Sequence, residues 1–161
     1  MNVKAWACGW AIAVSCGLAA MAEGPREPAD EWGNLDGEWL FRTDPGEVGE
    51  KEGWHLPAHD ERGWRVLQAP GYWEPQGVTD VRPGEAAKRI DGVRWTDYDG
   101  VAWYRLRFVA PRAWGGQELV LSLGSIDDQD RVFLNGKLVG ETGPGVRDAV
   151  FRHRLYRVEP G

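Results

Sequence analysis

The chain has 161 residues, with 25 acidic and 19 basic side chains and a formal net charge of −6. An acidic balance without a basic stripe argues against binding to nucleic acid or to anionic membrane surfaces. Both cysteines, Cys8 and Cys16, lie within the first 22 residues, which excludes a disulfide or a thiolate metal site in the rest of the chain. That remainder is long enough to rely on a hydrophobic core instead.

Residues 1–22 have the pattern of a secretory signal peptide. Lys4 supplies the positive charge, the run from Ala5 to Ala19 is apolar and small, and Ala20-Met21-Ala22 is an A-x-A cleavage motif. The apolar run is short for a membrane span, which needs about twenty residues. An uncleaved anchor and a lipoprotein modified at Cys16 are the alternatives. We therefore expect an exported protein, periplasmic or secreted, and its lack of further cysteines suits a bacterial source.

The segment after the leader, residues 23–34, is rich in Pro, Glu and Ala and is predicted to be a linker. First strands are expected at residues 35–42 and 64–68. Residues 44–61 and 74–97 lack sustained periodicity and are predicted to be long loops, although residues 83–90 would allow one or two helical turns.

Alternation of apolar and charged residues predicts a half-buried strand around residues 102–109. Tyr104, Leu106 and Phe108 share one face, and Arg105 and Arg107 share the other. The same period of two recurs in the next strand, at Leu119, Leu121 and Leu123.

A hairpin is predicted over residues 131–140, because Asn135-Gly136 separates two apolar runs and both residues tolerate positive φ. Another strand is expected at residues 150–158, with Phe151, His153 and Leu155 on one face. Together these strands predict an all-β, antiparallel β-sandwich over residues 35–161. A sheet that ends here exposes an unpaired strand edge, so we expect the sandwich to be truncated at its C-terminal edge and the chain to be a fragment. A natural stand-alone domain with a modified edge is the alternative.

Few residues after the leader are suited to catalysis. The only serines after residue 22 are Ser122 and Ser125, and neither lies in a G-x-S-x-G motif. His55 and His59 have a metal-ligand spacing, but Pro57 between them disfavours the helix that this spacing requires. We therefore expect no catalytic residues and no zinc site in this chain.

Asp127, Asp128 and Asp130 form an acidic loop between two predicted strands. Clustered carboxylates suit a calcium ion or the hydroxyls of a sugar. The favoured alternative is an Asp-rich turn whose side chains bond nearby backbone N–H groups.

Aromatic residues in the predicted loops suggest a carbohydrate site. Trp39, Trp64, Trp103 and Tyr104 lie in predicted strands, where burial is expected. The candidate sugar-binding residues come from the loops instead: Trp73, Trp95, Tyr98 and Asp99. The alternative, which we favour, is that these aromatic rings anchor the loops or pack against a neighbouring domain.

Several motifs resemble one known type of domain. They are WYRLRF at 103–108, LVLSLGSIDDQD at 119–130, VFLNGKLVG at 132–140, GEWLF at 37–41, and APGYW at 69–73. This set resembles the galactose-binding-like jelly-roll domain at the N-terminus of glycoside hydrolase family 2 enzymes, the β-galactosidase- and β-glucuronidase-like enzymes. A close relative of this domain accompanies the catalytic domain of secreted sialate O-acetylesterases. In both families the resemblance places the catalytic residues in a separate domain.

The resemblance implies a non-catalytic, carbohydrate-binding-like module of an exported carbohydrate-active hydrolase. Such a module would support the catalytic domain of the same longer chain and would contact glycan. A stand-alone, lectin-like glycan-binding protein is the alternative. No cofactor is expected, apart from the calcium ion considered for Asp127, Asp128 and Asp130.

Overall fold

The structure of the chain is a computed structural model that describes residues 10–17, 33–78, 88–90, 93–95, 98 and 100–160. These residues form β-strands and three short 3₁₀ helices. The strands are β1 (Trp10–Gly17), β2 (Gly37–Thr43), β3 (Arg65–Ala69), β4 (Lys88–Ile90), β5 (Val93–Trp95), β6 (Ala102–Val109), β7 (Leu119–Ser125), β8 (Asp130–Leu134), β9 (Lys137–Thr142) and β10 (His153–Val158). The 3₁₀ helices are η1 (Glu74–Gln76), η2 (Arg112–Trp114) and η3 (Ala149–Phe151). Within this described part, no helix is long and apolar enough to cross a membrane.

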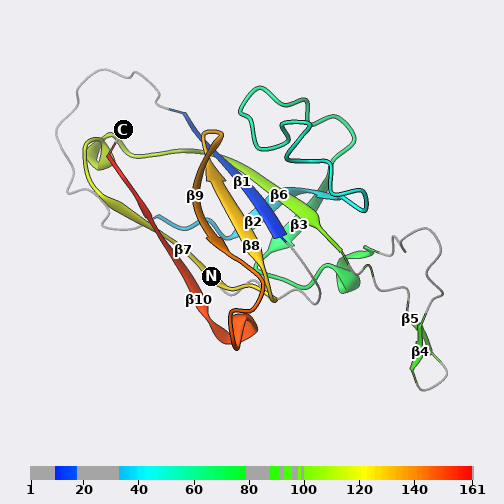
Figure 1. Cartoon of the computed structure of the whole chain (residues 1–161). Helices are drawn as coiled ribbons and strands as arrows, with labels where there is room; N and C mark the ends of the chain where they lie inside the picture. Colours follow the sequence, from blue (N-terminus) through cyan, green and yellow to red (C-terminus); the bar gives the residue numbers. More distant parts are fainter. Residues whose placement is uncertain are drawn as a thin grey trace.

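The strands form a large sheet, a second layer and a separate hairpin (Figure 1). The large sheet has the order β3-β2-β6-β1-β8-β9, and β10 and β7 form the second layer. β1 runs parallel to both of its neighbours, and the other strand pairings are antiparallel. The predicted antiparallel β-sandwich is therefore confirmed for the strands that follow β1. Asn135 and Gly136 between β8 and β9 have φ values of 52° and 82°, which confirms the predicted turn.

The main core lies between the two layers. Trp39, Phe41 and Tyr104 project inward from β2 and β6 and meet Leu123 of β7, and all four are at most 2% exposed. The rings of Phe41 and Tyr104 are 4.9 Å apart in an edge-to-face arrangement, which is favourable for aromatic pairs. Alternation along β2 and β6 thus supplies one face of the core, as the sequence pattern predicts.

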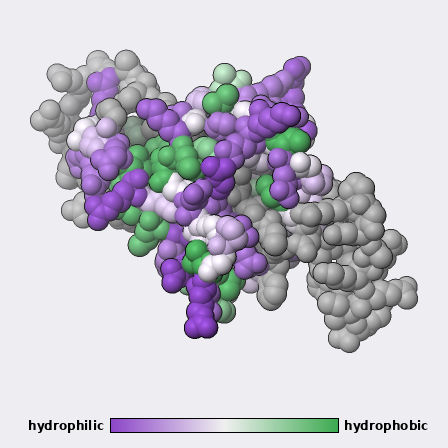
Figure 2. All heavy atoms as spheres, in the orientation of Figure 1, coloured by the Kyte–Doolittle hydropathy of each residue, from purple (hydrophilic) through white to green (hydrophobic). Residues whose placement is uncertain are grey.

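The face of the molecule shown in Figure 2 is mostly polar. On the face shown in Figure 2, hydrophilic residues predominate and hydrophobic residues form separate groups among them. Val120 on β7 and Leu155 on β10 are the most exposed apolar residues of the second layer, at 57% and 60%.

Two segments differ from the sequence prediction. Residues 88–90, part of the stretch 83–90 for which one or two helical turns are predicted as an option, form strand β4 and pair with β5. Residues 83–87 lie outside the described residues. Residues 10–17, inside the predicted signal peptide, form β1 in the middle of the large sheet. The cleavage of that leader, and the domain boundaries at residues 22 and 34, stay predictions.

Candidate functional site

A long loop, residues 44–64, covers the outer face of the large sheet beside β2, β6 and β8. Side chains alternate across a strand, so Trp103 and Arg105 face this loop while Tyr104 faces the core. Trp54 and Trp64 from the loop pack against Trp103 and Phe133 in a second buried cluster. The loop therefore has a small aromatic core of its own.

Asp44 fixes the beginning of this loop. Its buried carboxylate accepts hydrogen bonds from the backbone N–H groups of Val48 (2.9 Å) and Gly49 (2.7 Å) and from Nε1 of Trp103 (3.1 Å). A Cβ at Gly49 would lie 2.3 Å from that indole nitrogen, so the close approach requires glycine.

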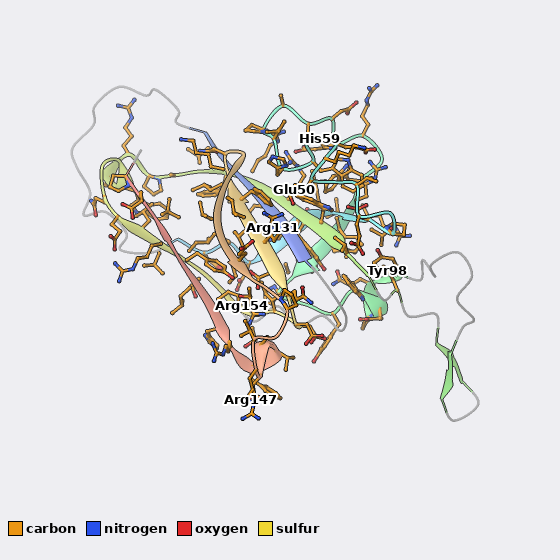
Figure 3. The ribbon with its side chains drawn as sticks, viewed as in Figure 1. Glu50, His59, Tyr98, Arg131, Arg147 and Arg154 are labelled. Atoms are coloured by element: carbon orange, nitrogen blue, oxygen red, sulfur yellow. The ribbon has the colours of Figure 1, made fainter. Side chains whose placement is uncertain are left out.

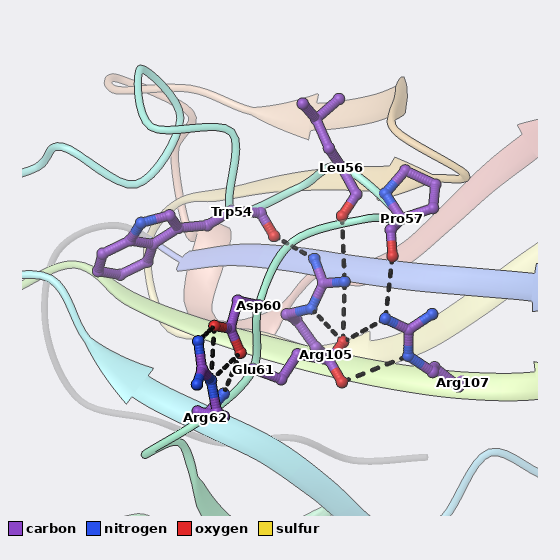
Figure 4. A network of polar contacts seen from close by, with 8 residues as sticks. All are labelled: Trp54, Leu56, Pro57, Asp60, Glu61, Arg62, Arg105 and Arg107. Atoms are coloured by element: carbon purple, nitrogen blue, oxygen red, sulfur yellow. Dashed lines mark hydrogen bonds and ion pairs between the residues drawn. The ribbon is translucent and has the colours of Figure 1, made fainter.

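Arg105 and Arg107 hold the rest of the loop against β6 (Figure 4). Arg105, only 3% exposed, donates to the carbonyl oxygens of Trp54 and Leu56 (3.2 Å for Leu56) and to the Glu61 carboxylate at 2.9 Å. Arg107 donates to the carbonyl oxygen of Pro57 and to Glu61, both at 2.9 Å. The sequence predicts only that these arginines share the polar face of a strand; the covering loop makes one of them a buried anchor.

The charges of this anchor affect two titratable groups. Burial alone would raise the pKa of Glu61, but hydrogen bonds from Arg107 and Arg105 outweigh it and hold that pKa below its usual value. Burial, assisted by the nearby positive charge of Arg105, lowers the pKa of His59. The His59 ring packs against Trp54 and Trp64, which favours its neutral form.

The predicted acidic loop is organised around an arginine. Asp130 and Arg154 are 1% and 2% exposed, and Nε of Arg154 lies 2.5 Å from Oδ1 of Asp130. The Tyr156 hydroxyl donates to the other carboxylate oxygen at 2.5 Å, and its pKa is raised by burial and by this bond. Arg154 belongs to β10 and is labelled in Figure 3. Its remaining N–H groups donate to four carbonyl oxygens, those of Ile126, Asp128, Ala149 and Arg152.

This network changes how the three aspartates are interpreted. Both carboxylate oxygens of Asp130 are engaged by protein donors, and Asp128 adopts a left-handed turn conformation with φ of 54°. Among the described residues, no three His, Cys, Asp or Glu side chains converge as a metal site. The geometry therefore gives Asp130 a structural role, and a calcium ion at Asp127, Asp128 and Asp130 stays a prediction.

The predicted sugar-binding residues divide into two groups. Trp73 and Tyr98 are 0% and 1% exposed, and their rings pack edge to face at 5.7 Å in the main core. Trp73 also packs against Phe41, and the Tyr98 hydroxyl donates to the carbonyl oxygen of Val101 at 2.6 Å. The structure therefore shows both rings packed in the core, in line with the favoured alternative, and their role in sugar binding stays a prediction. The Trp95 side chain and Asp99 lie outside the described residues.

A polar hollow of about 260 Å³ lies beside β9 and β10. Its lining includes Glu141, Thr142, Arg152 and His153. The Thr142 hydroxyl is 2.9 Å from the Tyr156 hydroxyl, so it is held within the Asp130 network.

The fold defines the described part of the chain as an antiparallel β-sandwich resembling the sandwich domain of glycoside hydrolase family 2. No family model matches the chain. The particular proteins that it resembles are β-glucuronidases. It is 30% identical over 104 residues to a β-glucuronidase from Paenibacillus borealis, an alignment that covers 64% of this chain and 15% of that protein.

Solved structures agree with this similarity. Ruminococcus gnavus β-glucuronidase in complex with uronic deoxynojirimycin matches with a TM-score of 0.52 at 25% identity, over 79% of this chain and 19% of that one. The same enzyme in complex with D-glucuronic acid gives the same values. The chain thus spans about a fifth or less of the length of these relatives.

Proposed function

We propose that the chain is an accessory β-sandwich module of an exported glycoside hydrolase, in which it supports a catalytic domain carried elsewhere in the polypeptide. One observation carries the proposal: the structural match covers 79% of this chain and only 19% of the R. gnavus β-glucuronidase. A module that corresponds to so small a part of an enzyme is expected to share its scaffold rather than its catalytic residues.

The engagement of the acidic side chains supports a scaffold role. A glycosidase needs two carboxyl groups about 5–9 Å apart across an accessible sugar. Asp44 and Asp130 are at most 2% exposed, and Asp44, Asp130 and Glu61 accept hydrogen bonds that hold loops in place. These carboxylates therefore stabilise the module and are poorly placed to act on substrate.

The named relatives favour one of the two hydrolase classes considered from the sequence. Both are β-glucuronidases, so we place the module in a glycosidase acting on a β-linked uronic acid, in preference to a sialate O-acetylesterase. Trp95 and Asp99 stay the candidate residues for contact between the module and the glycan.

Activity measurements test this proposal. The complete secreted product of the gene and this 161-residue chain, both expressed with the leader, are assayed with 4-nitrophenyl β-D-glucuronide and 4-nitrophenyl acetate. We expect the complete product to hydrolyse the glucuronide and the 161-residue chain to hydrolyse neither compound. Turnover by the 161-residue chain would contradict a non-catalytic module, and a complete product that cleaves only the acetyl ester would favour the esterase.

The lectin-like alternative makes a separate prediction. A stand-alone glycan binder should show a saturable change in tryptophan fluorescence with glucuronate or galactosides, and Trp95→Ala should abolish it. Buried Trp73 provides the control, because Trp73→Phe should change stability without changing a sugar response. A saturable, Trp95-dependent change in the fluorescence of the 161-residue chain on adding sugar would favour the lectin-like protein over the scaffold module.

A further inference from the structure

The connection between β9 and β10 is tied to the core by a buried arginine. Arg154 donates to the backbone carbonyl oxygens of Ala149 and Arg152, the latter at 2.7 Å. The backbone N–H of Arg152 in turn donates to the carbonyl oxygen of Ala149 at 3.0 Å. Side chains that this connection presents outward are therefore carried on a hydrogen-bonded backbone, which loses little freedom when a ligand binds.

The polar hollow beside β9 and β10 presents a positive charge that no neighbouring carboxylate balances. Arg152 and His153 line this hollow of about 260 Å³, and both are exposed. The acidic residue in the lining, Glu141, is paired with Arg131, whose Nε lies 3.2 Å from its carboxylate. The exposed Asp148 belongs to the same connection but does not line the hollow. Among the described residues, no carboxylate pairs with the Arg152 guanidinium, which favours an anionic ligand here.

The Thr142 hydroxyl adds a hydrogen-bond acceptor to the same hollow. The Tyr156 O–H donates to Oδ2 of Asp130 at 2.5 Å, so its oxygen accepts from the Thr142 hydroxyl at 2.9 Å. With its own proton used in this way, the Thr142 oxygen keeps lone pairs for a hydrogen bond from a ligand. The hollow therefore combines a cation for an acid group with an acceptor for a hydroxyl group.

Exposed apolar side chains accompany these polar groups. Leu155 lines the hollow and is 60% exposed, and Phe151, which precedes Arg152 in the chain, is 76% exposed. Small-molecule sites commonly combine apolar contact surface with a few polar groups that fix orientation. A uronic acid offers a carboxylate, hydroxyl groups and apolar C–H faces, so its chemistry matches the cation, the acceptor and the apolar side chains.

We propose that the hollow lined by Thr142, Arg152 and His153 binds a uronic acid unit of a glycan. The choice of a uronic acid among anionic ligands rests on the proposed function. The planar guanidinium of Arg152 donates to the carboxylate, His153 supplies a ring N–H, and Thr142 accepts from a hydroxyl group. A site of this kind raises the local concentration of an acidic glycan around the hydrolase.

A photoreactive ligand tests the site in the complete secreted product. The ligand is a C-linked D-glucuronide that carries a diazirine and cannot be hydrolysed. After irradiation, an endoprotease that cleaves after glutamate releases residues 142–159 as one peptide, which contains the proposed contacts. We expect this peptide to be labelled and unlabelled D-glucuronate to suppress the label. D-glucuronamide keeps the hydroxyl groups without the charge, so it should compete about tenfold more weakly.

Substitutions of Arg152 test the assigned contact. Arg152→Gln should reduce labelling of residues 142–159 by about tenfold, because it removes the charge. The fold should be retained, since Arg154 binds only the backbone carbonyl of this residue. Arg152→Lys keeps the charge without the planar pair of N–H groups and should reduce labelling less. Arg157→Gln is the matched control, because Arg157 is exposed on the same strand, pairs with Glu118 and does not line the hollow.

The outcomes separate this site from the proposed function. If inorganic sulfate suppresses the label as effectively as D-glucuronate, the hollow binds anions only and the sugar site is overturned. Absence of label on residues 142–159, in a product that hydrolyses 4-nitrophenyl β-D-glucuronide, would overturn the site and leave the proposed function intact. Label that depends on Arg152, in a product that does not hydrolyse the glucuronide, would support the site and contradict the proposed function.

Discussion

Replacing Arg154 with methionine should destabilise the module strongly. The side chains of Arg154 and Asp130 are 2% and 0% exposed, and methionine keeps much of the arginine's volume while removing its charge and donors. Asp130 would keep only the Tyr156 hydroxyl, and four backbone carbonyl oxygens would lose their donor. Removing one partner of a buried ion pair costs about 3–5 kcal/mol. The bond from Tyr156 places our expectation near the lower end, about 3 kcal/mol.

Hydrogen exchange of β8 and β10 amides in the secreted protein measures this effect locally. A change of about 1.4 kcal/mol in free energy changes an equilibrium constant tenfold. A loss of about 3 kcal/mol of stability should therefore accelerate amide exchange that requires opening of these strands by roughly 100-fold. Arg157→Met is the matched control on the same strand, because Arg157 and its partner Glu118 are 75% and 49% exposed. An exposed pair of this kind contributes about 0–1 kcal/mol, so the control should change exchange by only a few fold.

A double substitution distinguishes the lost pairing from a general packing defect. Arg154→Met combined with Asp130→Leu removes both buried charges, and the double variant should be more stable than Arg154→Met alone. Equal exchange rates for Arg154→Met and Arg157→Met would refute the expected contribution of the buried Arg154–Asp130 pair to stability.

Two further predictions concern the loop and the edge of the sheet. Burial lowers the pKa of His59 in the folded state, so the unfolded state binds the proton more readily and stability should fall as the pH drops below about 6.5. His59→Phe should flatten this dependence of stability on pH, whereas His153→Gln at an exposed position should leave it unchanged. The free energy of unfolding is measured by urea unfolding between pH 5 and 7.5. If it changes equally with pH in the wild type and in His59→Phe, burial of His59 is not the cause of the dependence. A Cβ at Gly140 would lie 1.9 Å from Cδ1 of Tyr156, so Gly140→Ala should cost about 1–3 kcal/mol. A Cβ at Gly143 would have no atom within 4 Å, so Gly143→Ala should change the free energy of unfolding by no more than about 0.5 kcal/mol. Similar urea unfolding midpoints for the two variants would show that the Tyr156 ring moves aside freely.

Local signals explain which parts of the fold the sequence predicts. The alternation in β6 and the Asn135-Gly136 turn depend on residues next to one another, and the structure has the strand and both positive φ angles. The burial of Trp73 was harder to predict, because flanking Pro and Gly residues indicate a loop whether or not its ring turns inward.

Long-range contacts explain what the sequence does not predict. The bond from Arg105 to the Trp54 carbonyl joins residues 51 positions apart, and no local pattern indicates that a strand arginine will be covered by a loop. Likewise, Arg154 and Asp130 are 24 positions apart, so the acidic loop can be interpreted as a cation site until its arginine partner is located. The apolar leader fits two interpretations, since the same composition suits an exported signal sequence and a central strand.

The intact mass of the native secreted product, combined with peptide mapping and a β-glucuronide assay of the same fraction, tests the central claim most directly. We predict that peptides from this chain occur in a product well above 18.0 kDa that hydrolyses 4-nitrophenyl β-D-glucuronide. An active or sugar-binding product of 18.0 kDa or less would contradict the account of the chain as an accessory module.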